Sequence, residues 1–161
     1  WQYMASFCHS RQRCSSCRFF FLLTQTYVFI QFIFKKISKS DVPIKQILLH
    51  QKIIAGIGNI YASEILFDSK ISPLTLGKDL EISLIMKLIK SIRKILKKAI
   101  KYGGTTLKDF RRVGGEVGYF QNKLQVYGKE GQECCRRKCI GSVEKVVISG
   151  RSTFYCATCQ K

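Results

Sequence analysis

Acidic residues are scarce in this 161-residue chain, which has 10 Asp and Glu against 28 Lys and Arg and a formal net charge of +18. The basic residues are spread along the chain rather than collected in one tail. A surplus of this size indicates an anionic partner, and it favours nucleic acid over an acidic membrane surface. A hydrophobic content of 46% is enough for a buried core, which excludes a disordered tail.

The chain also lacks an apolar run that suits a membrane span. Residues 19–34 come nearest, but Thr24, Gln25, Thr26 and Gln31 interrupt them, and the stretch is short for a bilayer. No small-residue cleavage site follows the apolar run at 19–23, so we expect no secretory signal. The expected protein is cytoplasmic and has no membrane partner; membrane association through residues 19–34 is an alternative.

Cysteine is missing from the whole middle of the chain, between positions 17 and 134. Eight cysteines fall instead into two clusters, at Cys8, Cys14 and Cys17 and at Cys134, Cys135, Cys139, Cys156 and Cys159. Close spacing of this kind favours metal ligation over a disulfide framework, and it predicts a reducing compartment.

The second cysteine cluster has the spacing of a zinc finger. Two close pairs separated by a β-hairpin can supply the four thiolates of a tetrahedral zinc site without a large core. We expect one structural Zn²⁺ held by Cys135, Cys139, Cys156 and Cys159, with Cys134 as the alternative to Cys135. The first cluster, together with His9, could hold a second metal, but no strand or helix is predicted there to position the ligands.

Residues 1–28 show neither helical nor strand periodicity and contain no acidic residue, so we expect a segment outside the fold, in a chain that is a fragment. From position 29 helices are predicted at 29–37, 43–51, 60–67 and 80–102, and Asp41 and Asn59 are expected to cap the second and third. Strands are predicted at 144–149 and 151–155. The fold class is therefore mainly α with a small β-hairpin.

The turn at Gly56-Ile57-Gly58-Asn59 joins two of these helices, as in a helix-turn-helix variant. Amides at the start of a helix can bind an anion, which in a basic protein would be a DNA phosphate; a plain helix connection is the alternative. The basic outer face of the helix at 80–102 is interpreted as the solvated side of a scaffold helix.

Five strings carry a resemblance to a known family. They are Gln51–Glu64 (QKIIAGIGNIYASE), Gly103–Phe110 (GGTTLKDF), Gly118–Gln121 (GYFQ), Val126–Gly128 (VYG) and Gly150–Cys156 (GRSTFYC). In this order they resemble the C-terminal half of the formamidopyrimidine-DNA glycosylases over about residues 29–161, and they look more like this branch than like the endonuclease VIII branch.

The resemblance implies a fold, an activity and a partner. The fold would be a helix-two-turn-helix DNA-binding domain at 29–127 followed by a four-cysteine zinc-finger hairpin at 128–161, with the family's N-terminal β-sandwich absent. The family excises oxidised purines and cleaves the strand at the abasic site by β,δ-elimination. The implied partner is double-stranded DNA with an oxidised purine or an abasic site, bound by a monomer.

The resemblance also assigns roles to residues. Lys45, Gly58, Asn59, Tyr61 and Arg151 would bind DNA, and Arg151 would also donate a proton in δ-elimination. The loop that closes over the extruded base would comprise Thr105, Thr106, Leu107, Lys108, Asp109 and Phe110.

The chain departs from the family at its catalytic centre. The family's nucleophile is an N-terminal proline followed by glutamate, whereas this sequence begins Trp1-Gln2-Tyr3. We therefore expect DNA and zinc binding without catalysis in the chain as printed. The alternative is a zinc-dependent nucleic-acid-binding module with no repair role.

Overall fold

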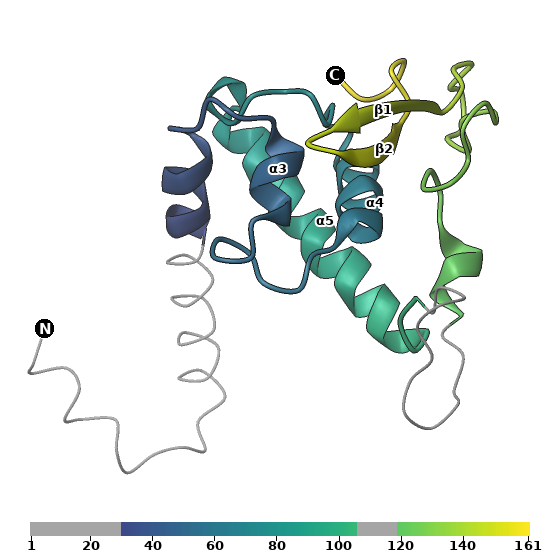
Figure 1. Ribbon diagram of the computed structural model, residues 1–161, viewed down its shortest axis with the longest axis horizontal. Coiled ribbons are helices and arrows are strands. Elements are labelled where there is room, and N and C mark those ends of the chain that lie inside the picture. Colours follow the sequence, from purple (N-terminus) through teal and green to yellow (C-terminus); the bar gives the residue numbers. More distant parts are fainter. Residues whose placement is uncertain (1–29, 106–118) are drawn as a thin grey trace, which may run out of the picture.

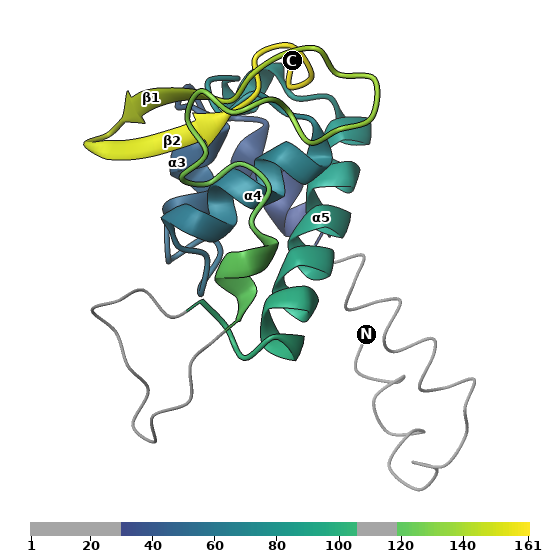
Figure 2. The ribbon, with the colours of Figure 1, turned by 90° about the vertical axis from the view of Figure 1, so that its right-hand side faces the viewer.

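The computed structural model describes residues 30–105 and 119–161 (Figures 1 and 2). The expectations for residues 1–28, including the second metal site at Cys8, His9, Cys14 and Cys17, lie outside these ranges. Within the ranges, helices make up the first part and a two-stranded antiparallel sheet lies near the C-terminus. The predicted fold class is confirmed. Across the described ranges, no helix combines the length and the apolar character needed to cross a bilayer.

Four helical segments lie close to their predicted positions. Residues 30–37 are helical, and they are followed by α3 (Ile44–Leu49), α4 (Asn59–Ser69) and α5 (Ile82–Lys101), with a short 3-10 helix, η1 (Gly77–Asp79), before α5. A second 3-10 helix, η2 (Phe120–Lys123), lies between α5 and the sheet. The apolar faces of the α-helices share one core, which includes Ile37, Leu48, Leu66, Leu88 and Ile92. Burial at helical spacing is why the sequence pattern predicted α5. Helix α4, in contrast, is buried continuously from Ala62 to Phe67.

Both predicted side-chain caps are wrong. Asp41 pairs instead with Lys78 on the surface, at 2.7 Å, and Pro43 occupies the N-cap of α3 without a side-chain cap. Gly58 is the N-cap of α4, so Asn59 is the first helical residue. An N-cap side chain accepts a hydrogen bond from an amide two or three residues further on, but Asn59 already lies inside the helix, and its Nδ2 makes a tertiary contact described below.

The hairpin consists of β1 (Glu144–Ile148) and β2 (Arg151–Tyr155), paired so that Ile148 lies opposite Arg151. Only Ser149 and Gly150 remain for the turn, and both have positive φ, at 50° and 71°. Such a turn matches the right-handed twist of the two strands. It places Arg151 at the first position of β2, directly beside the tip of the hairpin.

A second, smaller core lies beneath the hairpin. It contains Phe67 from α4, Val143, Phe154 and two buried cysteines. The chain end is fixed beside it, because the Gln160 side chain donates a hydrogen bond to the Ile71 carbonyl at 2.8 Å and accepts one from the Cys156 amide at 2.9 Å. The C-terminal unit, residues 128–161, is therefore packed against α4.

Candidate functional site: a four-cysteine cluster beside a basic hairpin site

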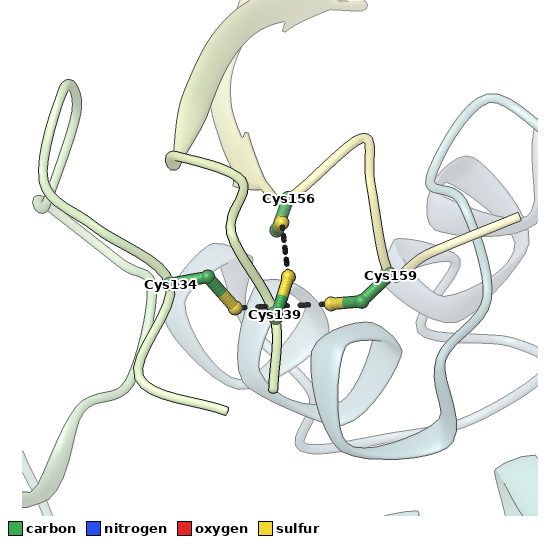
Figure 3. A group of neighbouring side chains, drawn as sticks. All are labelled: Cys134, Cys139, Cys156 and Cys159. Carbon is green, nitrogen blue, oxygen red and sulfur yellow. Dashed lines mark hydrogen bonds between the residues drawn. The ribbon is translucent and has the colours of Figure 1, made fainter. Parts of the chain in front are cut away.

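Four cysteine sulfurs converge where the two ends of the hairpin meet (Figure 3). Cys134 and Cys139 precede β1, Cys156 and Cys159 follow β2, and all four Sγ atoms lie within 4.8 Å of one another. The Sγ atoms of Cys134 and Cys159 are 3.8 Å apart, and those of Cys139 and Cys156 are 3.7 Å apart. A tetrahedral metal with bonds of about 2.3 Å to sulfur requires sulfur–sulfur distances of about 3.8 Å. The residues present therefore fit a tetrahedral metal ion.

The sequence-based preference for Cys135 over Cys134 is wrong in this geometry. Cys135 is exposed, and its sulfur lies 3.9 Å from the Gln125 carbonyl oxygen, outside the cluster. The Cys134 amide donates to the Gly141 carbonyl at 2.8 Å, and the neighbouring Glu133 forms an isolated antiparallel bridge with Ser142, so the backbone is extended here. Successive side chains of an extended segment point to opposite sides, so only one of two adjacent cysteines can face the other ligands.

Burial is the main cause of a raised pKa at the Cys134 and Cys159 thiols. A thiol must lose its proton to become a metal ligand, so metal loading would release protons from these groups. Gly141 lies close to the cluster, and a Cβ built there would come within 3.1 Å of the Cys156 sulfur and would overlap the Thr158 hydroxyl oxygen. The cluster therefore needs glycine at position 141.

A buried lysine connects the helical part to the hairpin. The Lys45 side chain in α3 is fully buried, and its Nζ donates hydrogen bonds to the Thr153 hydroxyl and, at 3.3 Å, to the Ser152 carbonyl. Burial, reinforced by the positive charge of Arg151, lowers the pKa of Lys45 from 10.5 to about 8. Below about pH 8 the buried amine is charged, which lowers the free energy of unfolding. This destabilisation disappears as the pH rises toward 10.5, where the amine of the unfolded chain also loses its proton.

Asn59 reaches the same strand from the start of α4. Its Nδ2 donates to the Ser152 carbonyl at 2.9 Å and lies 3.5 Å from the Tyr127 hydroxyl. Its Oδ1 is shielded from water and has no hydrogen-bond partner among the described residues. Lys45 and Asn59 therefore converge on Ser152, the residue after Arg151.

Arg151 itself is exposed at the rim of this arrangement. It lines an open pocket of about 260 Å³ between the hairpin turn and the C-terminal end of α3. The other lining residues are Gln46, Leu49, His50 and Ser149. A guanidinium in this position is accessible to an anion, and its planar fork can contact two oxygens of a phosphate.

Hydrogen bonds with the Gln51 side chain stabilise the glycine turn before α4. The Gln51 side chain accepts a hydrogen bond from the Gly56 amide and donates one to the Ile57 carbonyl, each at 3.0 Å. The first bond of the helix runs from the Ala62 amide to the Gly58 carbonyl, at 2.9 Å. The amides of Asn59 and the two residues after it consequently have no acceptor within the helix, which is the condition for anion binding at a helix start.

Tyr61 lies apart from the Lys45 and Asn59 arrangement. Its hydroxyl accepts a hydrogen bond from the Thr105 hydroxyl at 3.3 Å, and its ring packs 5.6 Å from that of Phe120. Thr105 pairs in turn with Tyr119 across the ends of the 106–118 segment. The predicted loop residues Thr106 to Phe110 lie outside the described ranges.

Sequence reasoning did not single out Glu64, although it lies within one of the matched strings. Its buried carboxylate accepts hydrogen bonds of 2.9–3.0 Å from the amides of Gln125, Val126 and Tyr127. Its position as an acidic residue in the apolar run of α4 was the available signal. Glu64 thus ties α4 to the segment that leads into the cysteine cluster.

The residues of the helical part match a family model described as the formamidopyrimidine-DNA glycosylase H2TH domain, over residues 24–111. This range is more than half of the chain. The chain belongs to the formamidopyrimidine-DNA glycosylase family.

Relatives and solved structures agree with this membership. The chain is 50% identical over 131 residues to a formamidopyrimidine-DNA glycosylase of Zymomonas mobilis, covering 81% of this chain and 47% of the relative. It is 48% identical over 132 residues to that of Rickettsia bellii, covering 82% and 48%. The chain thus spans about half the length of the curated relatives it matches.

Among solved structures, the Fpg of Lactococcus lactis in complex with DNA containing an abasic site superposes with a TM-score of 0.75 at 40% identity, covering 82% of this chain and 48% of that one. The MutM (FPG) protein of Thermus thermophilus superposes with a TM-score of 0.76 at 38% identity, covering 81% and 49%. A further L. lactis structure contains DNA with Fapy-dG.

Proposed function

We propose that this chain is the DNA-binding, zinc-binding C-terminal half of a base-excision repair glycosylase and abasic-site lyase for oxidised purines. It would bind duplex DNA at an oxidised purine or an abasic site, as a monomer in the cytoplasm. The observation that carries the proposal is the convergence of Lys45 and Asn59 on the strand that begins with Arg151. The complexes of the L. lactis relative with abasic-site and Fapy-dG DNA support it.

In this proposal the hairpin site binds the DNA backbone. The free amides at the start of α4 and the Asn59 side chain would bind one phosphate. Lys45 would contribute a positive charge from the buried side of this site. Arg151 would contact a phosphate from the tip of the hairpin. These contacts position the duplex and carry no base specificity. Arg151 would also donate the proton of δ-elimination, and Thr105 to Phe110 would form the loop over the damaged base.

We assign Zn²⁺ to the four-cysteine cluster. All four ligands are sulfur, and a tetrahedral set of four thiolates is characteristic of structural zinc. No position is left open for a substrate, so the metal would supply folding energy rather than chemistry. The ion would hold both ends of the hairpin, and through them the strand that carries Arg151.

The family's catalytic pair is a proline followed by glutamate, and neither proline of this chain, at 43 and 73, is followed by glutamate. We therefore propose that the chain as printed binds damaged DNA without cleaving it. Borohydride reduction in the presence of abasic-site DNA should give no covalent adduct, and a trapped adduct would refute this part of the proposal. Equal affinity for intact and abasic duplexes would favour a zinc-dependent nucleic-acid-binding module without a repair role.

Arg151→Ala should weaken binding to an abasic-site duplex by about tenfold and lower the slope of log affinity against log salt by about 1, because it removes a phosphate contact. Fluorescence anisotropy over a salt series measures both quantities. Arg137→Ala, at another exposed arginine of the C-terminal unit, is the matched control and should leave the slope unchanged. Equal slopes for Arg151→Ala and the unmodified protein would exclude Arg151 from the interface.

The affinity for DNA should also fall by about tenfold between pH 7 and pH 9. Burial favours the neutral amine of Lys45 in the free protein, where its pKa is about 8, whereas a bound phosphate favours the charged form. Binding above pH 8 must therefore take up a proton. Lys45→Met should bind more weakly at pH 7 and show a flat profile. The same steep profile in Lys45→Met would assign the titration to another group.

A further inference from the structure

The outward face of α5 carries a basic stripe. Lysine or arginine occupies seven of the twenty positions in this helix, and none is acidic. Five exposed lysines recur at intervals of three and four residues, which places them on one side of the helix: Lys87, Lys90, Lys94, Lys97 and Lys101. The opposite side is buried in the core through residues such as Leu88, Ile92 and Ile95.

These charges are mostly uncompensated in the described part of the chain. Of the five lysines, Lys94 forms an ion pair there, with Asp68 at 2.6 Å, and the other four form none. From Lys87 to Lys101 the stripe extends for about 21 Å, at about 1.5 Å per residue. A row of like charges repels itself, so a polyanion lying along it would relieve the repulsion and release its own counterions.

The stripe faces away from the proposed site at the hairpin. Helix α4 contacts both α5 and β2, so it lies between them (Figure 2). Because the buried side of α5 packs against α4, the lysine side points in the other direction, and within the described ranges only Lys94 of the five lysines reaches back to α4, at Asp68. A duplex bound at Arg151 would therefore leave the α5 stripe free.

We propose that the α5 stripe binds a second segment of duplex DNA without reading its sequence, so that one protein molecule can bridge two duplexes. This inference rests on the proposed function for the duplex at the hairpin site. Each DNA strand carries one phosphate per about 3.4 Å of helix axis, so about 21 Å of duplex lying against the stripe holds roughly six phosphates on each strand. Lysines on flexible stems suit contacts to phosphate that carry no sequence information. An amphipathic helix docks on a membrane through its apolar face, and in α5 that face is buried.

The test mixes the protein with two undamaged duplexes that carry different dyes and measures particles carrying both by fluorescence cross-correlation. The unmodified protein should give a cross-correlated fraction that falls steeply with salt. Combined substitution Lys87→Gln, Lys90→Gln, Lys97→Gln and Lys101→Gln should reduce that fraction at least tenfold. A variant with the same charge change elsewhere, Lys35→Gln, Lys36→Gln, Lys39→Gln and Lys123→Gln, should retain it.

The inference would be overturned by the absence of cross-correlation with the unmodified protein, or by equal cross-correlation with the α5 variant. Binding of phosphatidylserine vesicles through the α5 lysines, in place of a second duplex, would also overturn it. Fluorescence anisotropy with a single duplex distinguishes failure of the α5 inference from failure of the proposed function. The proposed function is contradicted when Arg151→Ala leaves abasic-site binding unchanged, whereas the α5 inference is contradicted when the α5 variant leaves bridging unchanged.

Discussion

Cys134→Ser should abolish tight metal binding and unfold the C-terminal unit, whereas Cys135→Ser should leave both intact. Cys134 is buried and its sulfur lies 3.8 Å from that of Cys159, while Cys135 is exposed and points elsewhere. A structural zinc ion contributes on the order of 10 kcal/mol of apparent binding free energy, and in so small a unit this is folding free energy. Loss of one of four ligands should therefore have the largest effect of any single substitution in the chain.

The two cysteine variants form a matched pair, because they make the same chemical change at adjacent positions. Metal content by atomic absorption and thermal melting by circular dichroism, each before and after treatment with a chelator, measure the effect. The unmodified protein and Cys135→Ser should lose a melting transition on chelation, and Cys134→Ser should lack it from the start. Full metal content in Cys134→Ser together with loss of metal in Cys135→Ser would return the assignment to Cys135.

Unfolding of the hairpin should also weaken DNA binding. The strand β2 follows the turn that presents Arg151, and Lys45 and Asn59 use Ser152 of the same strand as a hydrogen-bond acceptor. Chelation should thus reduce DNA affinity in the unmodified protein and have no further effect in Cys134→Ser. Unchanged DNA affinity after complete removal of the metal would separate the cluster from the DNA site.

Glu64→Gln should lower the free energy of unfolding by about 3 kcal/mol, although it preserves shape. Oε1 accepts hydrogen bonds from three amides and Oε2 shares the Gln125 N–H with it, and the carboxylate itself is buried. A glutamine amide replaces one of these acceptors by a donor that faces another N–H group, and it removes the negative charge that all of these bonds favour.

Urea denaturation of the metal-loaded protein measures this effect. Glu133→Gln makes the same change at an exposed position and should alter the free energy of unfolding by no more than about 0.5 kcal/mol. If Glu64→Gln lowers the free energy of unfolding by less than about 1 kcal/mol, water must be accepting the hydrogen bonds of these amides in place of the carboxylate. Glu64→Ala should be at least as destabilising as Glu64→Gln, since it leaves every one of those amides without an acceptor.

The sequence predicted features that depend on neighbouring positions. Helix α5 was predicted to within about two residues because its apolar side recurs at helical spacing over five turns. The hairpin was recognisable from short strands around Gly150 and from the flanking cysteines. The resemblance to the family supplied the roles proposed for Lys45 and Arg151, which periodicity alone could not suggest.

Features that depend on distant partners were missed or misassigned. The contact partner of Asn59 lies 93 positions away, at Ser152, so local capping rules suggested a role that the side chain does not have. Cys135 looked preferable to Cys134 because it is nearer to Cys139 in sequence, but the direction of each side chain depends on a backbone pairing between residues 134 and 141. Glu64 gave no sign of its three amide partners before the fold was known.

The hydrogen bonds from Lys45 and Asn59 to β2 are made within the fold itself. In the proposed function these contacts would hold the phosphate-binding groups in place, so little conformational entropy would be lost when a phosphate binds. Association should then require no slow rearrangement at these residues, and the rate at which DNA is captured should be governed by diffusion and by the long-range field of a chain with a net charge of +18.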